Sequence, residues 1–363
     1  MAGPRIVRFS GPRQVDVVVG AVEDCPAGTV RVRTLFSGIS AGTELTAYRG
    51  SNVYLNKGWD AERHLFVPEH PSVTYPLSGW GYSEVGMVVE IGGGGDTTGS
   101  PTGTVSVGDV VYGVWGHRGE AVVPAAGLAG HALPPELDPV AGVFVRVGAI
   151  ALNALLAADL HVTESVVVMG QGVIGLLATR LAVLSGATVL AVDRIERRRA
   201  AARHLGAAQT LDPTSGRDVA AQVRALTGAG ADAAIELSGA YPALHEAIRS
   251  VQPGGRVVAA GFYQGPATGL DLGEEFHHNR VSVVASQIGG PPTALTHRWT
   301  VARLHRAVLG LLADGMVDVT SLVSHVVPVR DAASAYRLLD EDPSAALQVV
   351  LDFRDSAAEA SPE

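Results

Sequence analysis

Short apolar runs alternate with helical patterns through the middle of the chain. Continuous apolar runs predict strands at residues 165–169, 188–192, 231–236, 256–260 and 281–286. Apolar positions at helical spacing predict helices between these strands, at residues 173–185, 194–205, 218–226 and 242–251. Short buried strands that alternate with helices are typical of a parallel sheet covered by helices on both faces. This part of the chain is therefore predicted to fold as a doubly wound α/β domain.

Both flanks of this α/β segment show a different pattern. Alternating apolar and polar positions at residues 30–34, 86–91 and 109–112 predict short strands of a mainly antiparallel β region. The glycine-rich segment 92–103 predicts a surface turn and not a phosphate loop, because no helix follows it. Beyond residue 292 the pattern predicts a helix at residues 299–315 and a strand at residues 347–353.

Composition and charge narrow the class of protein. The 36 acidic and 27 basic residues give a net charge of −9 without a basic tail, so we expect no nucleic-acid or membrane partner. Cys25 is the single cysteine, which excludes a disulfide framework, an iron–sulfur cluster and a multi-cysteine zinc site. Arg146, Asn153 and Asp159 interrupt the most apolar stretch, and the N-terminus has no apolar signal core. We therefore predict a cytoplasmic protein.

The strongest motif directly follows a predicted strand and opens a predicted helix, as a dinucleotide fingerprint requires. Its glycines permit a tight turn, close approach of a pyrophosphate to the backbone, and close helix–strand packing. The alternative is a glycine-rich turn without a ligand. The predicted cofactor-binding residues of this loop are Gly170, Gln171, Gly172, Val173, Ile174 and Gly175.

The residues after the second predicted strand bear on the choice between NAD and NADP. Asp193 can accept hydrogen bonds from ribose hydroxyls and would repel a 2′-phosphate, which favours NAD. Arg194 and Arg198 keep NADP possible, although Arg198 could instead cover the ribose or adenine. For Arg197 and Arg199 we expect a solvated helix face.

Several further segments, in this order and spacing, resemble the medium-chain dehydrogenase/reductase superfamily, which includes zinc alcohol, sorbitol and threonine dehydrogenases. They cover nearly the whole chain and lie at residues 37–45, 81–86, 107–111, 170–175, 236–239 and 254–262. The resemblance implies a GroES-like β-rich catalytic domain at residues 1–147 and 291–363, and a Rossmann domain at residues 148–290. It also implies an active site in the cleft between them, and a homodimer.

The chain departs from the zinc members of this superfamily at the metal ligands. Ser40 and Ala41 stand where those enzymes carry a cysteine ligand, and Tyr82 stands where they carry a histidine. The third ligand position falls near Arg146. Serine and tyrosine do not satisfy a tetrahedral zinc site, so we predict no zinc. A compensating metal site from Glu69, His70 or Glu84 is the alternative.

Without a metal, hydrogen-bond donors must stabilise the developing alkoxide and an acid–base group must move the proton. Tyr82, Ser40, Thr43 and His117 are the catalytic candidates, and Arg146 could hold an anionic group of the substrate. Each also has a structural interpretation. Tyr82 could only line the space that zinc would otherwise fill, and Ser40 and Thr43 could cap backbone groups. His117 could be a hydrogen-bonded loop residue, and Arg146 could pair with a carboxylate.

Glu44 is expected to hold structure by pairing with an arginine, as the resemblance implies. The nicotinamide half of the cofactor is expected at the carboxyl ends of the predicted strands. The residues predicted to line it are Ser238, Gly261, Phe262, Ser286 and Gln287.

These features predict a zinc-independent, NAD-dependent oxidoreductase that interconverts a secondary alcohol and a ketone. The resemblance suggests a polar small molecule, such as a sugar, a cyclitol or a biosynthetic intermediate. Two alternatives stay open: an NADPH-dependent double-bond reductase of the enoyl or quinone type, and a cofactor-binding protein without catalysis.

Overall fold

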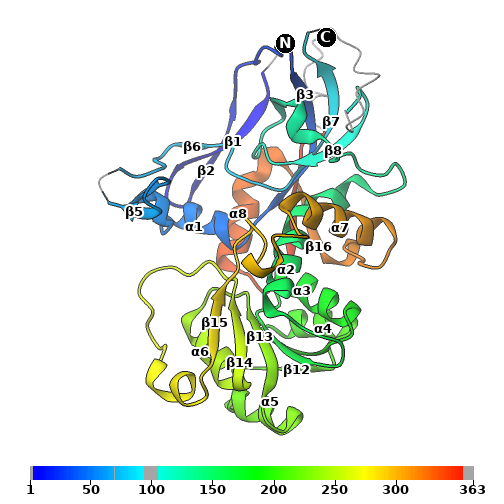
Figure 1. Ribbon diagram of the computed structural model, residues 1–363. Coiled ribbons are helices and arrows are strands. Elements are labelled where there is room, and N and C mark those ends of the chain that lie inside the picture. The colour runs from blue at the N-terminus through cyan, green and yellow to red at the C-terminus, as the bar shows by residue number, and fades with distance from the viewer. Residues whose placement is uncertain (1–2, 69, 94–104, 355–363) are drawn as a thin grey trace. The chain divides into compact units, whose positions relative to one another are not determined.

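The computed structural model describes residues 3–68, 70–93 and 105–354 (Figure 1). The chain divides into two compact units. The β-rich unit comprises Met1–Arg146 and Asp318–Glu363, and the parallel-sheet unit comprises Val147–Val317.

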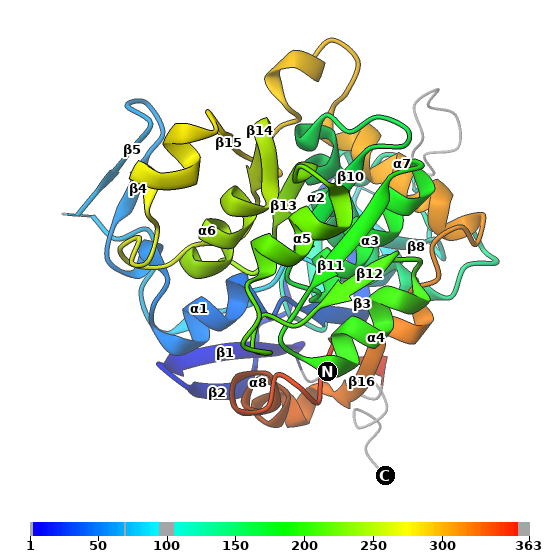
Figure 2. The same cartoon turned by 90° about the horizontal axis from the view of Figure 1, so that it is seen from below.

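The parallel-sheet unit is built on six parallel strands in the order β12-β11-β10-β13-β14-β15, which Figure 2 shows from below. This is the order of a Rossmann sheet, with the switch point between β10 and β13. The strands are β10 (Ser165–Met169), β11 (Thr188–Val192), β12 (Gln209–Leu211), β13 (Ala231–Glu236), β14 (Val251–Ala259) and β15 (Ser282–Ala285). The predicted doubly wound sheet is confirmed.

The helices of this unit bury the apolar faces that their periodicity predicted. Leu176, Leu177 and Leu181 of α3 are buried, and so is Ile248 of α6. Val167 and Val257 lie with Ile248 in one core cluster of the sheet. The helices are α2 (Phe144–Ala158, whose first turn belongs to the β-rich unit), α3 (Val173–Leu184), α4 (Glu196–His204), α5 (Val219–Thr227), α6 (Tyr241–Ser250) and α7 (Val301–Ala313).

Residues 291–317 were expected in the β-rich domain, but the structure places them in the parallel-sheet unit. Helix α7 packs so closely on α2 that a Cβ on Gly148 would lie 2.6 Å from Val308. The guanidinium of Arg180, on α3, donates two hydrogen bonds to the carbonyl of Met316. The chain therefore leaves this unit after α7, later than the sequence motifs indicated.

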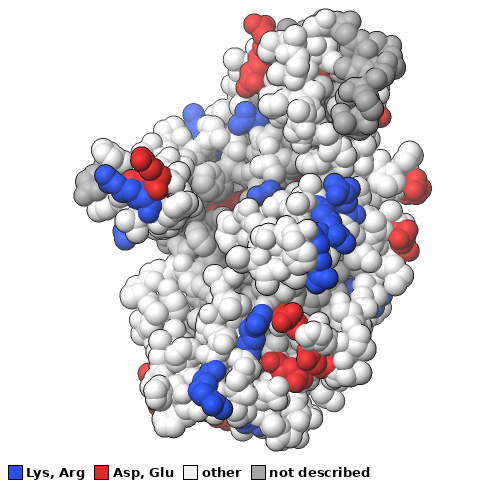
Figure 3. Space-filling model, viewed as in Figure 1, with Lys and Arg blue, Asp and Glu red and all other residues white. Residues whose placement is uncertain are grey.

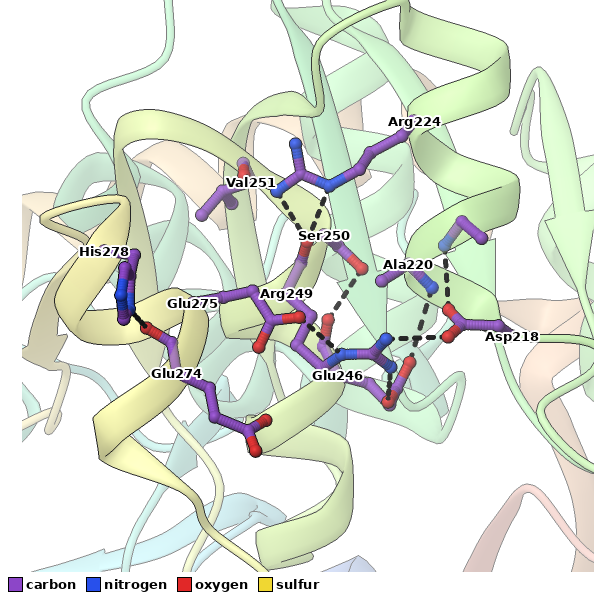
Figure 4. A network of polar contacts seen from close by, with 11 residues as sticks. Asp218, Ala220, Arg224, Glu246, Arg249, Ser250, Val251, Glu274, Glu275 and His278 are labelled. Carbon is purple, nitrogen blue, oxygen red and sulfur yellow. Dashed lines mark hydrogen bonds and ion pairs between the residues drawn. The ribbon is translucent and has the colours of Figure 1, made fainter.

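A network of polar contacts centred on Arg249 fixes one edge of the parallel-sheet unit (Figure 4). The guanidinium of Arg249 contacts Asp218 at 2.7 Å, Glu246 at 2.6 Å and Glu275 at 3.2 Å. These carboxylates raise the pKa of Arg249 further above its ordinary value, with the hydrogen bond to Asp218 as the largest cause. The network joins the start of α5, the end of α6 and the helical turn that contains Glu275.

The described residues of the β-rich unit form two sheets and a hairpin. One sheet has the order β2-β1-β6, the other runs β16-β17-β3-β7-β8 with β9 paired to β3, and β4 pairs with β5. Its strands are β1 (Arg5–Gly11), β2 (Gln14–Val19), β3 (Thr29–Ile39), β4 (Gly58–Asp60), β5 (Leu65–Val67), β6 (Leu77–Ser78), β7 (Glu84–Ile91), β8 (Val110–Gly113), β9 (Glu120–Pro124), β16 (Val323–Pro328) and β17 (Gln348–Asp352). Its helices are α1 (Thr43–Arg49) and α8 (Ala332–Glu341).

An aromatic cluster ties α1 and α8 to strand β1. The Tyr336 ring lies 5.0 Å from that of Phe9 and 5.6 Å from that of Tyr48, measured between centroids. All three side chains are buried. Helix α1 starts at Thr43, four residues after strand β3 ends, so the cluster also fixes the turn between them, which carries Ser40.

Most of the predicted turn at residues 92–103 lies outside the described residues. Among the described residues, Pro139–Ala158 is long and apolar enough to cross a membrane, but 72% of its most apolar window is buried inside the protein, as in a core helix.

On the face that Figure 3 shows, charged residues of both signs form small separate groups on a mostly uncharged surface. This face offers no broad basic patch for nucleic acid.

Candidate active site

Two of the predicted catalytic hydroxyls meet in the β-rich unit. The Oγ of Ser40 lies 2.5 Å from the hydroxyl of Tyr82. Ser40 follows the end of β3, and Tyr82 lies just before β7, so neighbouring strands of one sheet bring them together. Burial raises the pKa of Tyr82, and the charge of Glu44 adds to this, against the hydrogen bonds of Ser40 and Thr43 and the charge of Arg146. Tyr82 is therefore a proton-carrying donor at neutral pH.

Arg146, in the first turn of α2, lies over the ring of Tyr82, with its Cζ 5.5 Å from the ring centroid. Its Nε is shielded from solvent and has no hydrogen-bond partner. Among the described residues, no carboxylate is seen to pair with Arg146, which was the predicted alternative.

Behind these residues lies a fully buried ionic pair. His117 Nε2 is 2.7 Å from Glu44 Oε2, and both side chains have no exposed surface. Glu44 also accepts hydrogen bonds from the hydroxyl of Tyr336, at 2.8 Å, and from the backbone N–H of Ser40, at 3.0 Å. The expected arginine partner of Glu44 is wrong: His117 supplies the positive charge. Glu44 thereby fixes the turn that carries Ser40.

The other nitrogen of His117 extends the network to Glu84. His117 Nδ1 lies 2.6 Å from the Oγ of Ser37, whose hydroxyl donates to Glu84 Oε1 at 3.1 Å. Glu84 Oε2 accepts the backbone N–H of Trp115 at 2.9 Å. Burial raises the pKa of Glu84. Burial opposes the charged form of His117, but Glu44 and Glu84 outweigh it and raise the His117 pKa.

This geometry corrects the predicted role of His117 as a general acid in contact with the substrate. Its ring is completely buried and both nitrogens are in use, so it acts through Glu44 and Ser37 as a positioning residue. Sequence reasoning missed Ser37 and Tyr336, because nothing in the local sequence shows that β3, β7 and α8 converge on one buried histidine.

The donor set at the predicted metal position does not fit zinc. Zinc sites in proteins use thiolates, imidazoles and carboxylates. Ser40 and Tyr82 offer hydroxyls that bond to one another, and the positive charge of Arg146 lies beside them. Of the alternative ligands, Glu84 is engaged with backbone and Ser37, His70 is exposed, and Glu69 lies outside the described residues.

Among the described residues, one group has the spacing of metal ligands: His245, Asp271 and Glu274 in the parallel-sheet unit, with their ligand atoms within 4.8 Å of one another. Asp271 and Glu274 are exposed, and exposed acidic groups at such spacing are common without an ion. We assign no metal to this group.

The predicted dinucleotide loop, residues 170–175, runs from the end of β10 into α3, and its shape fits a dinucleotide. Gly170 has φ +88°, and a Cβ on Gly175 would lie 1.8 Å from the carbonyl oxygen of Gly170, so the turn requires glycine at both positions. A Cβ on Gly172 would meet nothing within 4 Å, which leaves open space over the backbone there. Gln171 is buried and bonds to Val168 and Thr179, so its side chain supports the loop from within. Val173 and Ile174 begin α3 and are partly buried.

Asp193 lies at the end of β11 and is coupled to this loop. Its Oδ2 accepts the backbone N–H of Gln171 at 2.7 Å, and its Oδ1 accepts that of Ile195 at 2.8 Å. Arg198 Nη1 is 3.9 Å from the same carboxylate, and Arg194 is exposed.

The expected solvated position of Arg199 is wrong. Its side chain is buried, pairs with Glu196 and Asp212, and donates to the carbonyl of Asp193 at 2.7 Å. Arg197 is exposed, as expected.

The predicted nicotinamide-side residues lie where β13, β14 and β15 end. Glu236, which the sequence analysis did not select, organises this edge: its buried carboxylate accepts the backbone N–H groups of Ser238 and Gly239 and the hydroxyls of Ser238 and Tyr263. Gly261 packs against Gly239, because a Cβ there would lie 2.3 Å from the Gly239 nitrogen.

Beside this cluster, Phe262 is 40% exposed and offers an apolar surface. Ser286 donates its backbone N–H to the carbonyl of Ala259 at 3.2 Å. Gln287 is exposed, and its backbone carbonyl accepts from the buried amide of Asn153 at 3.2 Å. The predicted residues thus share one edge of the sheet.

Comparisons with known proteins indicate the class of enzyme that this chain resembles. A family model described as zinc-binding dehydrogenase matches residues 173–302. D-guloside 3-dehydrogenase of Shigella flexneri is 29% identical over 336 residues, covering 90% of this chain and 93% of that enzyme. (R,R)-butanediol dehydrogenase of Bacillus subtilis is 27% identical over 341 residues, covering 88% and 91%. A Sinorhizobium meliloti 1021 structure, classed as a zinc-binding dehydrogenase and bound to NADP, matches with a TM-score of 0.75 at 21% identity, covering 97% of this chain and 100% of that chain.

Fold and relatives together define a two-domain dehydrogenase, so the chain is an enzyme. The family model and these relatives support the medium-chain dehydrogenase/reductase superfamily that its motifs predicted. Because the named relatives are dehydrogenases, the non-catalytic alternative has no support from them.

Proposed function

We propose that this enzyme is a zinc-independent, NAD-dependent oxidoreductase that interconverts a secondary alcohol and a ketone on a polar small molecule such as a sugar or a cyclitol. The observation that carries the proposal is the Ser40–Tyr82 hydroxyl pair beside Arg146, at positions where zinc members carry their ligands by resemblance. The sugar and diol substrates named for the two relatives support a hydroxylated substrate.

In the reaction, the bound dinucleotide supplies or accepts the hydride. Tyr82 donates a hydrogen bond, and then its proton, to the ketone oxygen as negative charge develops there. The Ser40 hydroxyl donates a hydrogen bond to the phenolate that remains, and water returns the lost proton to it through Ser40, which is only partly buried. Thr43 faces the same phenol. The raised pKa of Tyr82 keeps the proton on the phenol, so the site is set for reduction at neutral pH and for oxidation as the pH rises.

Asp193 favours NAD over NADP in this proposal. Its carboxylate faces the loop and would repel a 2′-phosphate, while each of its oxygens retains acceptor capacity for a ribose hydroxyl. In this arrangement the Arg198 side chain covers the adenosine of the bound dinucleotide.

The test is NADH formation with a panel of hexitols, glycosides and cyclitols, with NAD⁺ and NADP⁺ compared on each. We expect oxidation of at least one polyol with a higher kcat/KM for NAD⁺ than for NADP⁺. Reduction of enones by NADPH, with no polyol oxidised, would replace this proposal by the double-bond reductase.

A further inference from the structure

Arg146 is set apart from the other arginines that lie over aromatic rings. Arg303, over Trp299, donates to the carbonyl of Arg298 at 2.6 Å, and Arg354, over Phe36, pairs with Asp352. Among the described residues, the guanidinium of Arg146 has no oxygen partner of this kind, and its Nε is also shielded from water.

The fold supplies no hydrogen-bond acceptor to the shielded Nε of Arg146, although the residue as a whole is only half-buried. A buried donor without a partner is unfavourable, and the ring of Tyr82 offers only its π face. Glu44, whose charge also acts on Tyr82, is already bound to His117, Tyr336 and the backbone of Ser40. The fork of an arginine matches a carboxylate or phosphate through two parallel hydrogen bonds.

We propose that Arg146 binds an anionic group of the substrate, so that the enzyme acts on an acidic polyol, carrying a carboxylate or a phosphate, in preference to a neutral one. This proposal rests on the proposed function, because it places the anion beside the Tyr82 phenol that receives the substrate oxygen. The shared chemistry is a compact oxyanion, and the two sources are a sugar acid and a sugar phosphate.

The experiment compares kcat/KM for a hexitol, the matching hexonate and the matching hexitol phosphate. The variants are Arg146→Met, which keeps the length of the stem without the charge, and Arg146→Lys, which keeps the charge without the fork. Arg303→Met is the control, because it also removes an arginine from an aromatic ring, at an exposed position.

The wild type is expected to favour one charged substrate. Arg146→Met should lower kcat/KM for that substrate by about 10- to 100-fold, mainly through KM, as loss of a charged hydrogen bond predicts. The loss for the hexitol should be clearly smaller than the loss for the charged substrate, Arg146→Lys should recover part of the loss, and Arg303→Met should match the wild type. The charged substrate whose kcat/KM falls in Arg146→Met identifies the bound anion as a carboxylate or a phosphate.

Equal losses on neutral and charged substrates, or a wild type that prefers the hexitol, would overturn this inference and leave the proposed function standing. If no polyol is oxidised with either dinucleotide, the proposed function fails instead. Calorimetric titration of the hexonate and the hexitol phosphate into wild type and Arg146→Met, with NADH present, then decides the inference. Binding lost in the variant supports the anion site, and binding retained in the variant, or absent from both proteins, contradicts it.

Discussion

The Glu44–His117 pair can be broken by replacing His117 with leucine. Both side chains are completely buried, and their charged atoms lie 2.7 Å apart. Leucine would leave the carboxylate of Glu44 in the core with only the Tyr336 hydroxyl and the Ser40 N–H as partners. Removing one partner of a buried ion pair leaves an uncompensated charge, which costs about 3–5 kcal/mol.

The assay is urea unfolding at pH 7, followed by tryptophan fluorescence. Three of the four tryptophans, Trp59, Trp80 and Trp115, lie in the β-rich unit, so the signal reports the unit that contains the pair. We expect the free energy of unfolding to fall by about 3–5 kcal/mol, equivalent to a Tm lower by on the order of 10 °C. The double variant Glu44→Gln with His117→Leu should lose less than the sum of the two single losses.

His131→Leu is the matched control, because this histidine lies in the same unit, stacks on the ring of Tyr112 and contacts the carbonyl of Tyr112 at 3.1 Å. It should cost about 1 kcal/mol, as expected for one neutral hydrogen bond. A loss below about 1 kcal/mol for His117→Leu, or strict additivity in the double variant, would refute the view that a buried ionic pair holds this site.

Three other predictions follow from the site. Tyr82→Phe should lower kcat by about 100-fold with unchanged affinity for NADH in a fluorescence titration, whereas unchanged turnover would make Tyr82 a wall of the site. Because the folded pKa of His117 is raised above its ordinary 6.5, the stability that its proton contributes is complete below pH 6.5 and is lost as the pH rises through the folded pKa. The urea midpoint should therefore decline above pH 6.5 in the wild type and decline less in His117→Leu. Gly172→Ala should keep the wild-type Tm but lose NADH binding, since its Cβ enters only the space left for the pyrophosphate, while Gly175→Ala should lose both because its Cβ would lie 1.8 Å from the Gly170 carbonyl oxygen.

The parallel-sheet unit was the more predictable part of the chain, because its elements are set by local pattern. The strands β10, β11 and β13 have the bounds that their apolar runs predicted, and α3 differs by one residue at its end. The boundary after α7 was not predictable in the same way, since it depends on how Val308 fits against Gly148, a contact between residues far apart in the sequence.

In the β-rich unit the sequence identified Ser40, Tyr82 and Arg146 but not what surrounds them. These three residues could be selected because they occupy the positions at which zinc members of the superfamily carry their metal ligands, and one sequence is enough to show this. The role of His117 could not be found this way, because it depends on whether the ring points into solvent or into the core. Long-range pairing of β3 with β7 and packing of α8 decide that, and bring Ser37, Glu84 and Tyr336 around it.

We propose that the hydroxyls of Ser40 and Tyr82, without a bound metal, stabilise the reacting oxygen. The most direct test measures polyol-dependent NADH formation before and after exhaustive dialysis against a chelator, with zinc content per chain determined in the same samples. We expect the same kcat in both samples, whatever trace of zinc the first contains. Loss of activity on dialysis, restored by one equivalent of Zn²⁺, would contradict it.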